Sequence, residues 1–316
     1  MPDGYIVLPS DTFQNFALLR SILKEGGEAG IAKAVAYGKR AKLYPLAKAD
    51  NPPQTTYVDV ANVLFDSTIP YDLRFFQSLD RIVQSEPWLE RDRVMIDLLK
   101  SIGIEKGKPF NPDAKTKRIL DEAAREAHAW LDIKYQAGYS PAFFAGTNWA
   151  LPVSQAAVEG QSDGYAKRDI YPVDDRAVAY SIAFIGIKHL GAGQYYLMSM
   201  KDGQGRLLDG KRSYHLRFPP NVPVTQYWSV TAYDRDTHAF IRDVPSQSRS
   251  SQNPDLKKNA DGSVDIYFGP KAPAGKESNW VPTSAKGKFE VMLRFYAPQK
   301  ALFDKSWKLD NIEETK

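Results

Sequence analysis

The chain contains no cysteine, and among its 316 residues it has only four histidines and five methionines. The absence of cysteine excludes disulfides, thiol nucleophiles and cysteine-ligated metal sites. No run of about 18 apolar residues is present, so no membrane-spanning helix is predicted. The first residues, from Met1 to Tyr5, have neither a basic segment nor an apolar one and do not resemble a secretion signal.

Charge is also unremarkable: charged residues make up 25% of the chain and the formal net charge is +4. The densest basic stretches are Lys39–Lys42 and Lys115–Arg118. Nucleic-acid binding favours a basic stripe with interleaved aromatic residues. These short stretches instead predict solvated helix faces, so no nucleic-acid partner is expected.

The spacing of apolar residues changes along the chain and predicts an α+β fold. Helical spacing occurs in residues 28–42, after Tyr71, before Gly103, after Asp113 and again in 176–188. Asp113 is the predicted N-cap of the helix that follows it. Alternation typical of strands follows Gly193, with turn residues between the runs. The predicted strands are 195–200, 214–218, 227–233, 264–268 and 289–296. We expect a helical N-terminal half with a few strands, then an antiparallel β-sandwich of jelly-roll type.

Three segments are predicted from this pattern. Residues 1–137 are expected to form a partial N-terminal domain of helices and strand remnants, one of them at Tyr5–Leu8. Residues 138–175, rich in Gly, Pro, Ser and aromatic residues, are expected to be a connecting loop, and long loops in compact proteins are often functional. Residues 176–316 are expected to form the β jelly-roll domain.

Cofactor motifs are absent from the sequence. Gly191-Ala192-Gly193 leads into a predicted strand, whereas a dinucleotide fingerprint must open a helix. No Walker loop and no nucleophile elbow occurs, so we expect no cofactor. No two histidines have the spacing of a metal pair on a helix, and no metal site is predicted. The turn aspartates, for which calcium binding stays open, are Asp202, Asp209, Asp234 and Asp236.

The histidines are His128, His189, His215 and His238. His189 is the best candidate for proton transfer, because it follows Lys188 at a predicted helix end beside glycines that let a ligand approach the backbone. The alternative is a cation that interacts favourably with the helix dipole.

Residues inside the predicted strands suggest a ligand surface. Tyr227 and Tyr233 fall on one face of their strand and Trp228 on the other, so one set belongs to the core and the other is available for stacking. Arg217 and Arg294 each interrupt an apolar strand. Each either forms an ion pair or binds an anion.

Several C-terminal segments resemble a bacterial family. They are Gln226–Asp234, Asp255–Gly269, Gly275–Trp280, Leu207–Gly210 and Asp304–Trp307. Together they resemble proteins built from the paired domains of unknown function 1254 and 1214, and the resemblance covers essentially the whole chain. It implies a C-terminal jelly roll and export to the periplasm or beyond. It implies no activity and no catalytic residues. Relatives carry a β-containing segment before the part that starts here, so the chain is expected to begin inside the first domain.

Two functions are consistent with these observations. The first is an exported hydrolase or lyase that acts on a glycan or small carboxylate, with His189 and Lys188 as catalytic residues. Its predicted substrate-binding residues are Tyr195, Trp228, Arg242, Asn279, Trp280 and Arg294. The second is a non-catalytic cell-envelope binding or assembly protein. A deep polar pocket with a perturbed histidine or carboxylate would favour the enzyme, and a shallow aromatic face would favour binding. Self-association as a homo-oligomer is left open.

Overall fold

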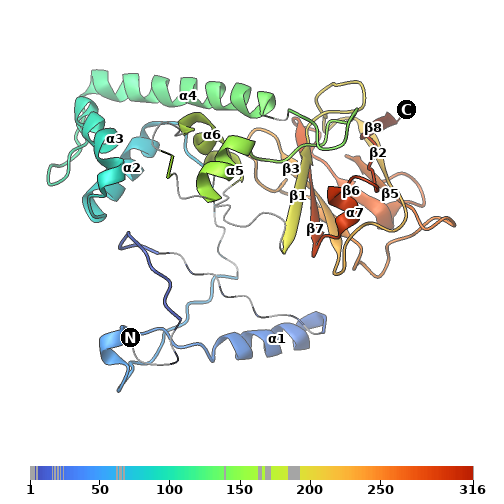
Figure 1. Ribbon diagram of the computed structural model, residues 1–316, viewed down its shortest axis with the longest axis horizontal. Coiled ribbons are helices and arrows are strands. Elements are labelled where there is room, and N and C mark those ends of the chain that lie inside the picture. Colours follow the sequence, from blue (N-terminus) through green and yellow to red (C-terminus); the bar gives the residue numbers. More distant parts are fainter. Residues whose placement is uncertain are drawn as a thin grey trace. The chain divides into compact units, whose positions relative to one another are not determined.

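The computed structural model describes residues 4, 6–15, 17, 19, 21, 23, 25–61, 63, 66, 68–138, 140–162, 166–167, 172–183 and 193–315. The chain divides into two compact units. The first comprises Met1–Asp66 and Arg74–Ile119, and the second comprises Ser67–Leu73 and Leu120–Lys316. The order of elements confirms the predicted α+β class, with helices first and β-sheets afterwards (Figure 1).

Short helices dominate the first unit. They are α1 (Gly27–Gly38), η1 (Leu46–Lys48), α2 (Leu73–Ser85), η2 (Glu90–Asp92), α3 (Arg93–Leu98) and η3 (Leu99–Ile102). Gly103 ends η3 in the left-handed conformation at φ 87°, as a C-terminal glycine does. The predicted strand at Tyr5–Leu8 is wrong for its described residues, because Ile6 to Leu8 pair with no neighbouring strand.

The predicted N-cap of the long helix is confirmed. The Asp113 carboxylate accepts a hydrogen bond from the backbone N–H of Thr116 at 2.7 Å, ahead of α4 (Ala114–Ala137). Three shorter helical elements follow: α5 (Gln155–Ser162), α6 (Val173–Val178) and η4 (Ala179–Ala183). Helix α5 lies inside the segment predicted as a connecting loop. Ser154 starts it by accepting a bond from the Ala157 N–H at 3.1 Å.

The C-terminal region is a sandwich-like pair of four-stranded sheets (Figure 1). One sheet has the order β1-β7-β3-β4 and the other β6-β5-β2-β8. The strands are β1 (Gln194–Ser199), β2 (Ser213–Phe218), β3 (Trp228–Asp234), β4 (Ser248–Ser250), β5 (Val264–Gly269), β6 (Trp280–Pro282), β7 (Phe289–Tyr296) and β8 (Glu313–Thr315). All five predicted strands are present, and the pairing is antiparallel except between β5 and β6.

Alternate residues of the central strands build the core between the sheets. Leu197, Val230 and Leu293 come from one sheet and Leu216 and Ile266 from the other, and all are at most 1% exposed. Each large apolar side chain buried in this way stabilises the fold by roughly 1.5–3 kcal/mol. The residues between them point to the outer faces, which leaves two outer sheet surfaces on which polar side chains can be displayed.

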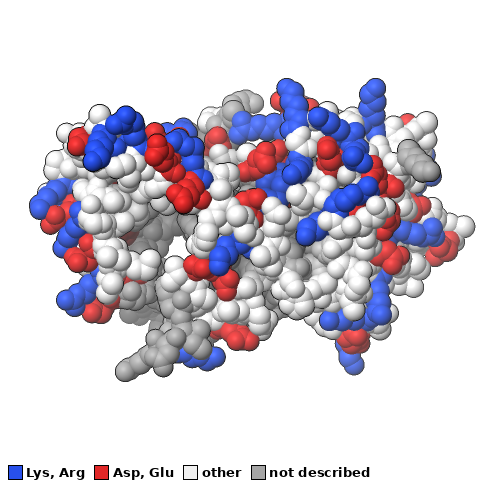
Figure 2. Space-filling view, turned by 90° about the horizontal axis from the view of Figure 1, so that it is seen from above, with Lys and Arg blue, Asp and Glu red and all other residues white. Residues whose placement is uncertain are grey.

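None of the helices that the structure describes is both long and apolar enough to cross a membrane. On the face shown in Figure 2, Lys and Arg side chains are interspersed with Asp and Glu. Among the residues coloured there, no continuous basic stripe is formed.

Candidate functional site

A histidine and an aspartate meet on the outer face of the sheet β6-β5-β2-β8. His215 of β2 is opposite Tyr267 of β5, and Arg217 is opposite Asp265. His215 and Asp265 are therefore diagonal neighbours on one face. The Nε2 atom of His215 lies 2.8 Å from Oδ1 of Asp265. The imidazole side chain is 29% exposed and the carboxylate side chain 16%, so the imidazole is the more accessible of the two to solvent.

The second oxygen of Asp265 is also held. The Asn259 side-chain amide donates to it at 2.8 Å and to the Ser263 hydroxyl at 2.9 Å. Burial alone would raise the pKa of Asp265, but the hydrogen bonds from Asn259 and His215, together with the charge of Arg217, lower it. The carboxylate is therefore ionised near neutral pH and accepts a hydrogen bond from the Nε2–H of His215.

Aromatic and cationic side chains surround this pair. The Tyr267 ring is 5.3 Å from the His215 ring, and the Lys276 ammonium is 5.8 Å from the Tyr267 ring centroid. Arg217 is exposed and donates to the Asp261 carboxylate at 2.7 Å. The imidazole, the Tyr267 ring and the Lys276 ammonium together form an outer-face surface that suits a polar substrate.

Two residues predicted from the sequence lie next to this site. Asn279 is 5% exposed and donates to the backbone carbonyls of Lys257 and Asp265, each at 2.8 Å. It also accepts a hydrogen bond from the Lys257 N–H at 2.9 Å, so its side chain is fully engaged with backbone groups. Trp280 is opposite Tyr267 in the parallel pair, is half-buried, and donates its indole N–H to the Gly269 carbonyl at 2.9 Å.

Two other predicted ligand residues lie in the core. Tyr195 is 7% exposed and its ring meets those of Phe143 and Phe303. Burial raises its pKa to about 12. Trp228 is 5% exposed and stacks on Phe218 of the facing sheet, with ring centroids 4.3 Å apart. The sandwich interior at these two positions is filled by side chains.

The remaining predicted residues are dispersed. Arg294 lies on the outer face of the opposite sheet, β1-β7-β3-β4, where it bonds to Thr231. Arg242 is exposed in the segment between β3 and β4. Lys188 and His189, the predicted catalytic residues, lie outside the described residues. Their roles stay predictions.

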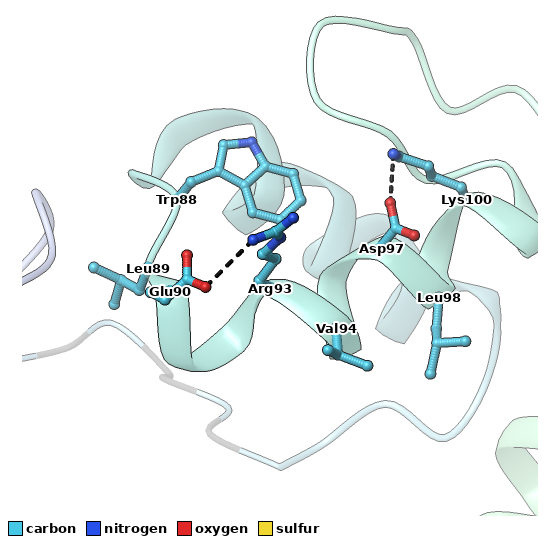
Figure 3. Close-up of a pocket in the computed structure, with 8 residues that line it drawn as sticks. All are labelled: Trp88, Leu89, Glu90, Arg93, Val94, Asp97, Leu98 and Lys100. Carbon is cyan, nitrogen blue, oxygen red and sulfur yellow. Dashed lines mark hydrogen bonds and ion pairs between the residues drawn. The ribbon is translucent and has the colours of Figure 1, made fainter.

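A hollow of about 600 Å³ lies along α3 in the first unit (Figure 3). Trp88, Val94 and Leu98 supply its apolar wall. Its charged side chains pair with each other three residues apart along the chain, Arg93 with Glu90 and Lys100 with Asp97. The hollow is lined by no histidine and by none of the residues predicted from the sequence, so it offers no evident acid–base chemistry.

Within the described part of the chain, no three His, Asp or Glu side chains are placed to hold a metal ion. His215 is one of the four histidines in the sequence, but the base predicted from the sequence is His189. The available signal was a histidine at an outward position of β2, two residues before Arg217. The carboxylate partner is 50 residues away in the sequence, so only the strand pairing reveals it.

Comparisons with known proteins agree with the C-terminal part of the resemblance. Residues 193–300 match the family described as "Protein of unknown function (DUF1214)". The N-terminal part of the resemblance stays a prediction. No curated protein matches this chain.

The solved structures that are similar to this protein include two bacterial proteins. One is the VPA0106 protein of Vibrio parahaemolyticus, with 22% identity and a TM-score of 0.45, over 92% of this chain and 66% of that one. The other is an uncharacterized protein of Burkholderia cenocepacia, with 16% identity and a TM-score of 0.35, over 67% of this chain and 46% of that one. The chain thus spans 66% and 46% of the lengths of these two proteins.

Proposed function

We propose that the C-terminal β-sandwich is a hydrolase or lyase for a glycan or small carboxylate, with His215 as its general base. The observation that carries this proposal is the 2.8 Å contact between the His215 Nε2 and the Asp265 carboxylate. An ionised carboxylate fixes the proton on Nε2, which leaves the lone pair on Nδ1. Among the described residues, Nδ1 of His215 has no hydrogen-bond partner, so it is free to take a proton.

The first step is the same for both reaction classes. In hydrolysis, Nδ1 takes a proton from a water whose oxygen attacks the substrate carbon, the bond from that carbon to the leaving oxygen breaks, and the leaving oxygen takes the proton back from the imidazolium. In elimination, Nδ1 takes a proton from the carbon beside a carboxylate, the C–H electron pair forms a C=C bond, and the bond to the leaving group breaks. The ammonium of Lys276, 5.8 Å from the Tyr267 ring centroid, lies where it can offset negative charge on the substrate.

Asn279 and Trp280 act as positioning residues in this proposal. Asn279 holds the backbone carbonyls of Lys257 and Asp265. Lys257 is two residues before Asn259, whose side chain donates to the Asp265 carboxylate, so Asn279 helps to position that carboxylate. Trp280 holds β6 against β5 through the Gly269 carbonyl. Displacement of a catalytic group by about 1 Å can lower a rate by roughly 10²-fold, so these buried contacts matter to catalysis without touching substrate.

The test is a turnover screen on acidic and neutral oligosaccharides and on simple esters. Reducing ends report hydrolysis, and ultraviolet absorbance of an unsaturated product reports elimination. We expect His215→Gln to lower kcat/KM by roughly 10²–10⁴-fold, the usual contribution of a general base. Asp265→Asn should lower it by about 10²-fold.

Two variants serve as controls. Asp255→Asn changes an exposed aspartate outside the site and should leave turnover unchanged. His189→Gln tests the base predicted from sequence. Full activity of His215→Gln would contradict the proposal, and loss of activity in His189→Gln alone would assign proton transfer to that residue.

A non-catalytic envelope binding protein is the second candidate. Tyr267 and Trp280 lie side by side on an outer sheet face, as expected of a stacking platform. Saturable binding of a substrate from the screen with no turnover in any assay would favour this alternative.

A further inference from the structure

The outer face of the other sheet, β1-β7-β3-β4, carries a cluster of tyrosines around one arginine. We call it the Arg294 face and define it by Tyr196, Tyr227, Tyr233, Arg294 and Tyr296. Tyr227 and Tyr296 stack on each other with ring centroids 4.0 Å apart and an interplanar angle of 14°. All five residues are half-buried, so each combines fixed packing with partial access to solvent.

Arg294 is held in place by neutral groups. Its Nη1 donates to the Thr231 hydroxyl at 2.9 Å, and its Nη2 donates to the Tyr233 hydroxyl. The guanidinium carbon is 5.7 Å from the Tyr196 ring centroid and 5.6 Å from that of Tyr233. Cation–π contacts and neutral acceptors orient a guanidinium without neutralising its charge.

The charge of Arg294 is thus left for a ligand. Among the described residues, no carboxylate forms an ion pair with it, in contrast to Arg217, which pairs with Asp261. The acidic residue on the same face of β7 is Glu290, but its side chain is 2% exposed and accepts bonds from Tyr135 and His238. The remaining N–H groups of Arg294 can therefore bind an anion without competition from Glu290.

The stacked pair of Tyr227 and Tyr296 lies beside Arg294, because Tyr296 is two residues after Arg294 in β7. Side chains two residues apart on one face of a strand are about 6.6 Å apart, so Arg294 and Tyr296 are spaced for adjacent parts of one sugar unit. A pyranose ring stacks its C–H groups on an aromatic face, and a carboxylate matches a guanidinium with two parallel hydrogen bonds. A uronic acid carries both features on one ring.

We propose that the Arg294 face binds acidic glycans, with the uronate carboxylate on Arg294 and the sugar ring on the Tyr227–Tyr296 pair. This site is separate from the His215 site, which lies on the outer face of the opposite sheet. Binding here would hold an acidic chain on the protein independently of any chemistry at His215.

The experiment is calorimetric titration of the full chain with trigalacturonate and with its methyl ester, which removes only the charge. We expect saturable binding of trigalacturonate that weakens with salt, and at least tenfold weaker binding of the ester. Arg294→Gln should weaken trigalacturonate binding at least tenfold, and Tyr227→Ala several-fold. Arg294→Lys keeps the positive charge but loses the planar guanidinium, so its affinity for trigalacturonate should lie between those of the wild type and Arg294→Gln.

Asp255→Asn is the control, because it changes an exposed aspartate that belongs to neither site and should bind trigalacturonate as the wild type does. Thermal melts of each variant separate lost binding from lost folding, and Arg294→Lys serves if Arg294→Gln does not fold. Two results would overturn the proposal. One is the absence of saturable binding to both trigalacturonate and a hyaluronan tetrasaccharide, and the other is equal binding of the acid and its ester.

Discussion

The Tyr135 hydroxyl donates a 2.8 Å hydrogen bond to the Glu290 carboxylate, and both residues are 1% exposed. The bond joins the last turn of α4 to β7. The Nδ1 atom of His238 lies 3.0 Å from the other oxygen of Glu290. Arg235 forms an ion pair with Asp132, and its Nε atom lies 3.9 Å from the Glu290 carboxylate. A buried carboxylate is stable only when its oxygens are satisfied, so this cluster holds the long helix to the sheet at a defined register.

Removing the Tyr135 hydroxyl should therefore destabilise the fold. Tyr135→Phe keeps the ring but leaves one Glu290 oxygen without its donor, at a cost of roughly 1.5–3 kcal/mol for a bond to a charged group. Urea unfolding followed by circular dichroism measures the change. Tyr180→Phe, at a tyrosine that is 71% exposed, is the control and should have no effect. Equal midpoints for Tyr135→Phe and the wild type would show that the bond contributes nothing net.

His128 should make stability depend on pH. Its ring stacks on Tyr71 at 3.7 Å, and burial lowers its pKa below the ordinary value. Between that lowered pKa and about 6.5, the unfolded chain binds more protons at this position than the folded chain does. The contribution of His128 to the free energy of unfolding is therefore fully present above about pH 6.5 and is lost as the pH falls toward the pKa of the folded state. His128→Phe keeps the stacking and should give a shallower pH dependence in unfolding titrations. Tyr71→Phe should retain the wild-type slope, and an unchanged slope in His128→Phe would contradict this assignment.

Asp261 should contribute at more acidic pH. Hydrogen bonds from the Ser263 side chain and backbone, with the Arg217 guanidinium, lower its pKa to about 2. A depressed carboxylate pKa stabilises the fold above the unfolded value of about 4, and this contribution is lost as pH falls toward about 2. In Asp261→Asn, the free energy of unfolding should therefore fall less steeply between about pH 4 and about pH 2 than in the wild type. Asp255→Asn is the exposed control, and a steep acid limb that persists in Asp261→Asn would refute the prediction.

Gly210 should tolerate no side chain. It is buried, its N–H donates to the Gly287 carbonyl at 2.8 Å, and a Cβ atom there would collide with the Ser284 carbonyl oxygen. Because that obstacle is backbone, Gly210→Ala should lower stability by at least roughly 1–3 kcal/mol. Gly193→Ala, where a Cβ would meet nothing within 4 Å, is the control. Thermal melts compare the two, and equal melting temperatures would contradict the close approach.

For the two arginines that interrupt strands, the sequence predicts the face of the sheet on which each lies but not its partners. Alternation placed Arg217 and Arg294 out of phase with the apolar residues around them, and both do lie on outer faces. An ion pair and an anion site were equally consistent with that pattern. Arg217 has Asp261 beside it, whereas Arg294 donates to the hydroxyls of Thr231 and Tyr233. The difference depends on which strands are neighbours, which no single strand encodes.

The amino-acid sequence by itself determined the α+β class, the positions of the five longer strands and the cap at Asp113, because periodicity and capping act within a few residues. Strands β4 and β6, with three residues each, are too short to show a period, and each exists through pairing with a longer strand. The tertiary structure alone decided that Trp228 faces the core and that His215 meets Asp265 across 50 residues of chain. Strand order and register fix such contacts, and they arise from the packing of the whole sandwich rather than from any local pattern.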